Sequence, residues 1–176
     1  MKNLLILILL TTSLSCCSND DSGDSLPPET QTGANTVGCL VDGKVFLPHQ
    51  EGINPSINCF YQFVDGEFFF SMNFADLRGV TNERVVIQTF RLALEEGRIY
   101  NLDKSTSKDG DYTGGGGVYE VSASNRYFTN DIKKGELTIT RVDLQNSIIS
   151  GTFWFDAINQ KGEIVEIREG RFDWNY

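Results

Sequence analysis

Side chains of the types that carry catalysis or bind metals are few in this sequence of 176 residues. The single histidine, His49, follows Pro48 in a segment that is expected to be a loop. A catalytic histidine needs a nucleophile within hydrogen-bond reach and an acid that orients its ring. The motifs Gly-x-Ser-x-Gly and His-Glu-x-x-His are both absent. We therefore expect no catalytic residue, and no catalytic role for His49.

Two acids, Asp109 and Asp111, precede a run of four glycines, Gly114–Gly117. Carboxylate oxygens are preferred ligands of Ca²⁺, but the further acids and the closing glutamate of an EF-hand loop do not follow at the required positions. The glycines also lack the strand-to-helix context of a phosphate-binding loop. Asp109 and Asp111 are therefore weak metal candidates, and residues 109–117 are predicted to form a hairpin loop. The sequence predicts no cofactor.

The charge balance excludes one class of partner. Lys and Arg number 15 against 24 Asp and Glu, so the formal net charge is -9 at pH 7. Nucleic-acid binding needs clustered Lys and Arg, so we expect no nucleic-acid partner. The acids are spread along the chain, and nothing around them singles out the pair of carboxylates that glycoside hydrolysis needs.

Three aromatic residues fall on the opposite side of their expected strands from the other alternating apolar residues: Phe60, Phe69 and Trp154. Outward aromatic rings on a β surface could stack on sugar rings or on the side chains of a protein partner. A closed fold could instead cover them with loops or a second sheet. These residues are therefore candidate contacts for a glycan or protein ligand, with burial as the alternative.

Four cysteines occur, two of them within the first 17 residues. The other two, Cys39 and Cys59, fall in expected strands that could be neighbours. A disulfide between them would close a loop of about 20 residues and contribute roughly 3 kcal/mol. The alternative is two free buried thiols that act as small apolar side chains.

The first residues have the order of a secretory signal. Lys2 is basic, residues 4–10 are all apolar, and residues 11–15 are mostly small and polar. A membrane-spanning helix needs about 20 apolar residues, so this run is too short to cross a bilayer.

Residues 11–17 resemble the lipobox of bacterial lipoproteins, in which a cysteine is acylated on its thiol and becomes the first residue after cleavage. Cys16 is favoured because the small Ser15 precedes it, whereas Cys17 has the better aliphatic residue three positions back. The resemblance implies that an N-terminal lipid holds the chain at a membrane.

The sequence thus predicts a signal peptide over residues 1–15, a lipid-anchored tether over 16–36 and a single domain over 37–176. Residues 18–36 contain four acids, no base and almost no large apolar residue, which is typical of a flexible tether. The segment Cys17–Asp21 resembles the acidic export signals of Bacteroidota lipoproteins. This implies an outer-membrane lipoprotein of the cell envelope, either surface-exposed or periplasmic.

The domain shows period-two alternation of apolar residues between turn dipeptides, and no long segment with helical spacing. Two Asp-Gly dipeptides, at residues 42–43 and 65–66, predict tight hairpins. Residues 84–94 are predicted to be a strand with Val86 and Phe90 among the apolar residues of one side. The other expected strands cover residues 38–41, 45–47, 58–64, 68–74, 118–123, 136–144, 147–157 and 164–174.

The apolar alternation of the last expected strand changes face partway along. Val165 and Ile167 share one face, whereas Phe172 and Trp174 share the other. A bulge at Gly170 would return all four side chains to the inner face. Eight or nine strands with short turns predict an all-β fold, an antiparallel meander that closes as a β-sandwich or flattened barrel.

Residues 32–46 resemble the opening of a family of Bacteroidota lipoproteins of unknown function, and residues 135–140, 149–155 and 170–173 resemble its later motifs. The resemblance implies a secreted, lipid-anchored β domain and supplies no activity and no catalytic residue. We accordingly expect a non-enzymatic binding or accessory module with an unidentified ligand. The alternatives are a carbohydrate-active or other hydrolytic accessory enzyme, and a purely structural surface protein.

Overall fold

A computed structural model of the chain describes residues 25–79, 81–105 and 112–176. The expected signal peptide, Cys16, Cys17, Asp109 and Asp111 lie outside these residues. Within the described ranges, no helix has the length and apolar character needed to cross a membrane. The strands are β1 (Thr36–Val41), β2 (Lys44–Phe46), β3 (Ile57–Val64), β4 (Glu67–Asp76), β5 (Glu83–Phe90), β6 (Ile99–Leu102), β7 (Gly114–Ser122), β8 (Asn125–Phe128), β9 (Gly135–Asp143), β10 (Ile148–Ile158) and β11 (Ile164–Asn175).

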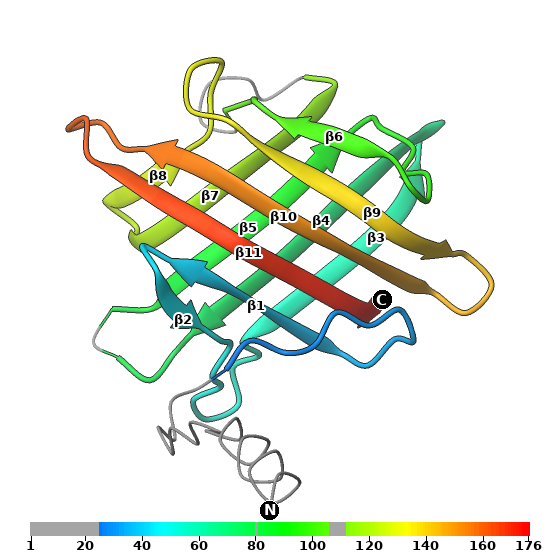
Figure 1. Cartoon of the computed structure of the whole chain (residues 1–176), viewed down its shortest axis with the longest axis horizontal. Coiled ribbons are helices and arrows are strands. Elements are labelled where there is room, and N and C mark those ends of the chain that lie inside the picture. The colour runs from blue at the N-terminus through cyan, green and yellow to red at the C-terminus, as the bar shows by residue number, and fades with distance from the viewer. Residues whose placement is uncertain (1–24, 80, 106–111) are drawn as a thin grey trace, which may run out of the picture.

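These strands form one sheet that folds over itself into two layers. The hydrogen-bonded order is β2-β1-β11-β10-β9-β6-β7-β5-β4-β3, and β8 pairs with both β10 and β7. Every pair is antiparallel except β6 with β7. In Figure 1, β9, β10 and β11 cross in front of β3, β4 and β5. The expected all-β, sandwich-like fold is confirmed.

The strand count exceeds the expected eight or nine because two strands are short. β6 and β8 have four residues each, too few to show repeated apolar alternation. Both connect the two layers: β6 joins β9 to β7, and β8 joins β10 to β7.

Both predicted Asp-Gly hairpins are present. Asp42 and Gly43 connect β1 to β2 with φ angles of 48° and 78°, and Asp65 and Gly66 connect β3 to β4 with φ angles of 51° and 88°. A two-residue turn with positive φ at both positions matches the right-handed twist of the strands that it joins. Asp followed by Gly tolerates this conformation, so local chemistry determines these two turns.

The bulge predicted in the last strand is also present. Phe153 of β10 pairs with Gly170, and Phe155 pairs with Ile167, so β11 has one residue more than its partner in this interval. The shift lies next to the expected glycine, where Glu169 has a φ of 51°. Beyond it, apolar side chains of β11 again point into the core.

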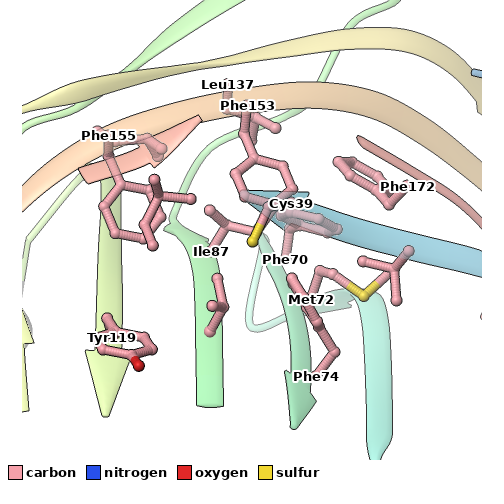
Figure 2. Packing of buried hydrophobic residues seen from close by; sticks show 14 of the residues in the cluster. Cys39, Phe70, Met72, Phe74, Ile87, Tyr119, Leu137, Phe153, Phe155 and Phe172 are labelled. Carbon is pink, nitrogen blue, oxygen red and sulfur yellow. The ribbon is translucent and has the colours of Figure 1, made fainter. Parts of the chain in front are cut away.

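Apolar side chains fill the space between the two layers, as Figure 2 shows. Phe70 of β4 stacks on Phe172 of β11 with ring centroids 5.7 Å apart, and Phe74 of β4 meets Phe153 of β10 edge-on at 6.3 Å. Removal of such apolar surface from water is the main favourable term in folding. The rings therefore hold the two layers together.

The segment before β1 is attached to the domain through the carboxylate of Asp173, which is 1% exposed. This carboxylate accepts hydrogen bonds from the Thr30 hydroxyl at 2.7 Å and from the backbone N–H groups of residues 32–34 at 2.8–3.1 Å. The hydroxyl of Ser150 on β10 also donates to it, at 2.7 Å. The expectation of a flexible tether as far as residue 36 is therefore wrong for residues 30–36, which belong to the folded unit. Leu26 and Pro27 also lie beside Gly38 of β1 and are half-buried.

These hydrogen bonds also determine the ionisation of Asp173. Burial alone would raise the pKa of this carboxyl. The bonds from Thr30, Ser150 and the backbone N–H groups stabilise the charged form, outweigh burial and hold the pKa well below its usual range. The carboxylate is therefore ionised at neutral pH.

The four-glycine run begins β7 and does not form the expected hairpin loop. A Cβ on Gly116 would lie 2.6 Å from the backbone oxygen of Lys104, and a Cβ on Gly117 would lie 2.8 Å from the ring of Phe155. Glycine is needed here because other parts of the chain approach both faces of β7 too closely for a side chain. The prediction of a loop fails because glycine marks close approach as well as turns.

Candidate functional site

The outer face of β5 carries four side chains of different chemistry in one row. Arg84, Val86, Gln88 and Phe90 are half-buried and alternate with the fully buried residues of the inner face. At about 3.4 Å per residue, the row is ~20 Å long. We call these four residues the β5 row.

Neighbouring strands make the β5 row the floor of a shallow hollow of about 280 Å³, which we call the β5 groove. Asn73 of β4 pairs with Val86 on one side, and Val118 of β7 pairs with it on the other. Phe128 of β8 follows next to Val118. The volume lies just below the ~300–1,000 Å³ of typical small-molecule sites, so the groove suits a small ligand or one part of a longer one.

Two side-chain amides, those of Asn73 and Gln88, line the β5 groove. Neither amide is hydrogen-bonded to another residue of the described chain, whereas the amide oxygens of Asn130 and Asn159 each accept two backbone N–H groups in turns. A side-chain amide offers two donors and one acceptor. The groove therefore presents hydrogen-bonding groups that a ligand can use.

One end of the β5 groove is charged. The Glu120 carboxylate accepts a hydrogen bond from Nε of Arg126 at 2.8 Å, and a terminal nitrogen of the same guanidinium also lies 2.8 Å away. Arg84 lies opposite Glu120 in the strand register. The Arg84 guanidinium forms no ion pair with any residue in the ranges that the structure describes. One positive charge is therefore left over at this end.

Aromatic rings occupy the other end of the groove. Phe90 contacts Phe69 with ring centroids 5.9 Å apart and Tyr112 with centroids 4.9 Å apart. Phe60 on β3 pairs with Ser71 of β4, which in turn pairs with Gln88 of the β5 row. Phe60 therefore faces the same side of the sheet. The structure thus places two of the predicted aromatic candidates, Phe60 and Phe69, on the same outer sheet face as the groove. Both are half-buried and lie beside the lining residues rather than among them.

The third aromatic candidate, Trp154, lies on β10 in the other layer. Its side chain is 38% exposed, but the guanidinium of Arg168 lies over the ring at 5.6 Å from the centroid. Its Nε1 donates to the Glu136 carboxylate at 3.3 Å. Trp154 is therefore separate from the β5 groove and is engaged by its neighbours.

His49 takes part in a contact at the end of β4. Its Nδ1 lies 3.0 Å from the backbone oxygen of Leu47 and 3.5 Å from the Asp76 carboxylate. Arg78 binds the same carboxylate at 2.7 Å, and its hydrogen bonds lower the pKa of Asp76. These contacts tie the loop that contains His49 to β4. No hydroxyl or thiol of the described residues is hydrogen-bonded to the histidine.

The disulfide considered for Cys39 and Cys59 is not formed, because both are free thiols. Cys39 lies on β1, which pairs with β2 and β11, whereas Cys59 lies on β3, which pairs with β4. The two strands are therefore not the neighbours that a bridge would need. Burial raises the pKa of both thiols, that of Cys59 to about 12, so both stay protonated and unreactive at neutral pH.

Metal ligands are not grouped in the described part of the chain. No cluster of three or more His, Cys, Asp or Glu side chains that could hold an ion occurs there. The weak metal candidates Asp109 and Asp111 lie outside the described residues, so their role stays a prediction.

The sequence-based prediction for β5 is wrong about which side faces the core. It grouped Val86 and Phe90 on the apolar side, but the structure buries Val85 and Ile87 instead. Both sides of β5 carry apolar residues, so alternation alone does not choose between them, and a shift of one residue exchanges the faces. Arg84 and Gln88 lie on the same side of β5 as Val86, and these two polar residues could have indicated from the sequence that this side faces outward.

These features define a two-layer all-β protein with a groove on one outer sheet face. Residues 65–173 match the model of a family described as Domain of unknown function (DUF6252), and the chain belongs to this family. The matched range includes every residue that lines the β5 groove. The comparison with curated proteins found no match, and neither did the comparison with solved structures.

Proposed function

We propose that this chain is a lipid-anchored protein of the bacterial cell envelope whose β domain binds a saccharide without catalysing a reaction. The observation that carries the proposal is the β5 groove, where two unbonded amides lie between an aromatic end and a charged end. Sugar rings have polar hydroxyl edges and apolar C–H faces. Amides can bond the hydroxyl groups, and aromatic rings can pack against the apolar faces.

The placement of the carboxylates favours binding over hydrolysis. Glycoside hydrolysis uses two carboxyl groups about 5–10 Å apart on either side of the scissile bond. The described lining of the β5 groove includes one carboxylate, Glu120, which is paired with Arg126. On the other outer face, Glu136 contacts the indole of Trp154, and Glu169 lies 3.3 Å from Arg171.

The lipid anchor is the part of the proposal that rests on the N-terminal sequence. An acyl chain on Cys16 or Cys17 would hold the domain at the outer membrane, facing either the cell surface or the periplasm. Because Leu26 and Pro27 already lie beside Gly38 of β1, about nine residues would separate an acylated Cys16 from the folded unit, a reach of at most ~30 Å. The groove would therefore stay within that distance of the membrane plus the width of the domain.

Metabolic labelling with a fatty-acid analogue tests the anchor. We expect label on the parent protein, and loss of label from whichever of Cys16→Ala and Cys17→Ala removes the acylated thiol. An unlabelled parent protein would contradict lipidation, whatever the variants show.

Substitutions in the β5 groove test saccharide binding by the purified full chain. On a glycan array followed by calorimetry, we expect Gln88→Ala and Phe90→Ala each to weaken binding about tenfold, since a central polar or aromatic contact contributes on the order of 1–2 kcal/mol. The matched control is Gln145→Ala, an exposed amide in the β9–β10 turn. Absence of any saccharide ligand, or equal binding by groove and control variants, would overturn the proposal.

A further inference from the structure

The charged end of the β5 groove is positive in a chain that is acidic overall. The formal net charge of the chain is -9. At the groove, however, the charge of Glu120 is balanced by Arg126 through two contacts of 2.8 Å. Among the described residues, none forms an ion pair with Arg84, which lies beside the hollow.

The other close neighbours of Arg84 do not neutralise it. Glu83 precedes it on β5, faces the opposite side by strand alternation, and accepts a hydrogen bond from the Tyr119 hydroxyl at 2.7 Å. The β4 residue opposite Arg84 is Ala75, which is uncharged. A guanidinium presents five N–H donors in a planar fork that matches the two oxygens of a carboxylate. This end of the groove therefore presents a guanidinium that no described residue pairs, and its shape is complementary to a carboxylate.

We propose that Arg84 binds the carboxylate of an acidic saccharide, such as a uronic acid unit, in the β5 groove. The inference rests on the proposed function and names its ligand class. Gln88 lies ~14 Å along the β5 row and Phe90 lies ~20 Å along it. The acidic unit sits at Arg84, with Asn73 as a diagonal neighbour, and further units extend toward Phe90.

The topology favours a saccharide over an acidic peptide. An extended peptide commonly binds to a sheet by adding a strand to an open edge. β5 has no open edge, because it pairs with β4 on one side and β7 on the other. A peptide therefore cannot add a strand to β5, and a ligand on the β5 row meets side chains rather than an open backbone edge.

The test compares acidic saccharides with their neutral methyl esters, which keep the sugar chain and lose the charge. The probes are short oligogalacturonates and sialyllactose, titrated into the purified full chain by calorimetry. Each is used as the acid, which is an ionised carboxylate at neutral pH, and as the methyl ester. We expect the acid form of one of these saccharides to bind about tenfold more tightly than its ester, and this preference to shrink with added salt. Arg84→Gln removes the preference and leaves affinity for the ester within about twofold. Arg98→Gln, an exposed arginine paired with Glu95, serves as the control and keeps the preference.

The outcomes separate this inference from the proposed function. Equal affinity for acid and ester, binding of neutral saccharides alone, or a preference that survives Arg84→Gln overturns the inference while saccharide binding stands. Absence of binding by all charged and neutral saccharides overturns both. A glutamate-rich peptide is titrated in the same way, and tighter binding of this peptide than of every saccharide also overturns both.

Discussion

Replacing Gly117 by alanine is expected to destabilise the domain by about 2–3 kcal/mol, as overpacking of a filled core does. The added Cβ would lie 2.8 Å from the ring of Phe155, which is fully buried between the two layers (Figure 2). β7 cannot easily move away, because Gly117 pairs with Ile87 and its N–H donates to the Thr129 hydroxyl at 2.9 Å. Urea titration followed by tryptophan fluorescence should show a lower midpoint with an unchanged slope.

A second substitution shows whether the clash with Phe155 is the cause. Phe155→Leu removes the ring, so the double variant should lose less stability than the two single variants together, with a coupling of about 1 kcal/mol or more. Ser124→Ala, an exposed position in the β7–β8 turn, serves as the control. A Gly117→Ala midpoint equal to that of the parent, or strictly additive losses, would contradict the packing described for β7.

Replacing Asp173 by alanine is expected to cost about 3 kcal/mol and to release the segment before β1. The carboxylate is the shared acceptor for Thr30, Ser150 and the backbone N–H groups of residues 32–34, and its removal leaves these donors unpaired. Amide hydrogen exchange should show loss of protection at residues 32–34. Asp131→Ala, an exposed acid, should leave it unchanged. Full protection in the Asp173 variant would show that other contacts hold the segment.

The same carboxylate predicts loss of stability in acid. Hydrogen bonds hold the pKa of Asp173 in the folded protein below the ~3.9 of an unfolded aspartate. A depressed folded-state pKa contributes stability above the unfolded value, and this contribution is lost as pH falls from about 4 toward the folded-state pKa. The free energy of unfolding of the parent should therefore drop in this window more than that of Asp173→Asn. Parallel pH profiles for the two proteins would contradict this assignment.

Features that depend on a few neighbouring residues could be predicted from the sequence. Asp42-Gly43 and Asp65-Gly66 determine their own turns, because few other dipeptides accept positive φ at both positions. The slipped parity of the last strand indicated a bulge beside Gly170, and the pairing with β10 confirms it. The all-β fold class follows from the same repeated local signals.

Features that depend on distant contacts could not be predicted. Thr30 and Asp173 are 143 residues apart, and nothing near either residue shows that a polar segment will wrap around a buried carboxylate. In the sequence, Gly117 cannot be distinguished from a glycine in a turn. Only the position of Phe155 in the fold shows why a side chain is excluded there. Neither the end of the tether nor the glycine run can be assigned without the fold.

The candidate site lies between these two cases. Phe60 and Phe69 were singled out by the alternation of their segments, and the structure places both on the same outer sheet face as the β5 groove, beside its lining. Arg84 and Gln88 were not singled out, because β5 carries apolar residues on both sides. Which side faces the core depends on the pairing of β5 with β4 and β7. The groove needs the register of four strands, which no single segment carries.

Mapping of amide chemical shifts during titration of the full chain with an acidic saccharide tests the central claim most directly. The β5 groove predicts that the largest shifts fall on Asn73, Arg84 and Gln88, with smaller ones at Val118 and Phe128. Shifts confined to the outer face around Trp154, or no shifts at saccharide concentrations that saturate binding in calorimetry, would contradict it.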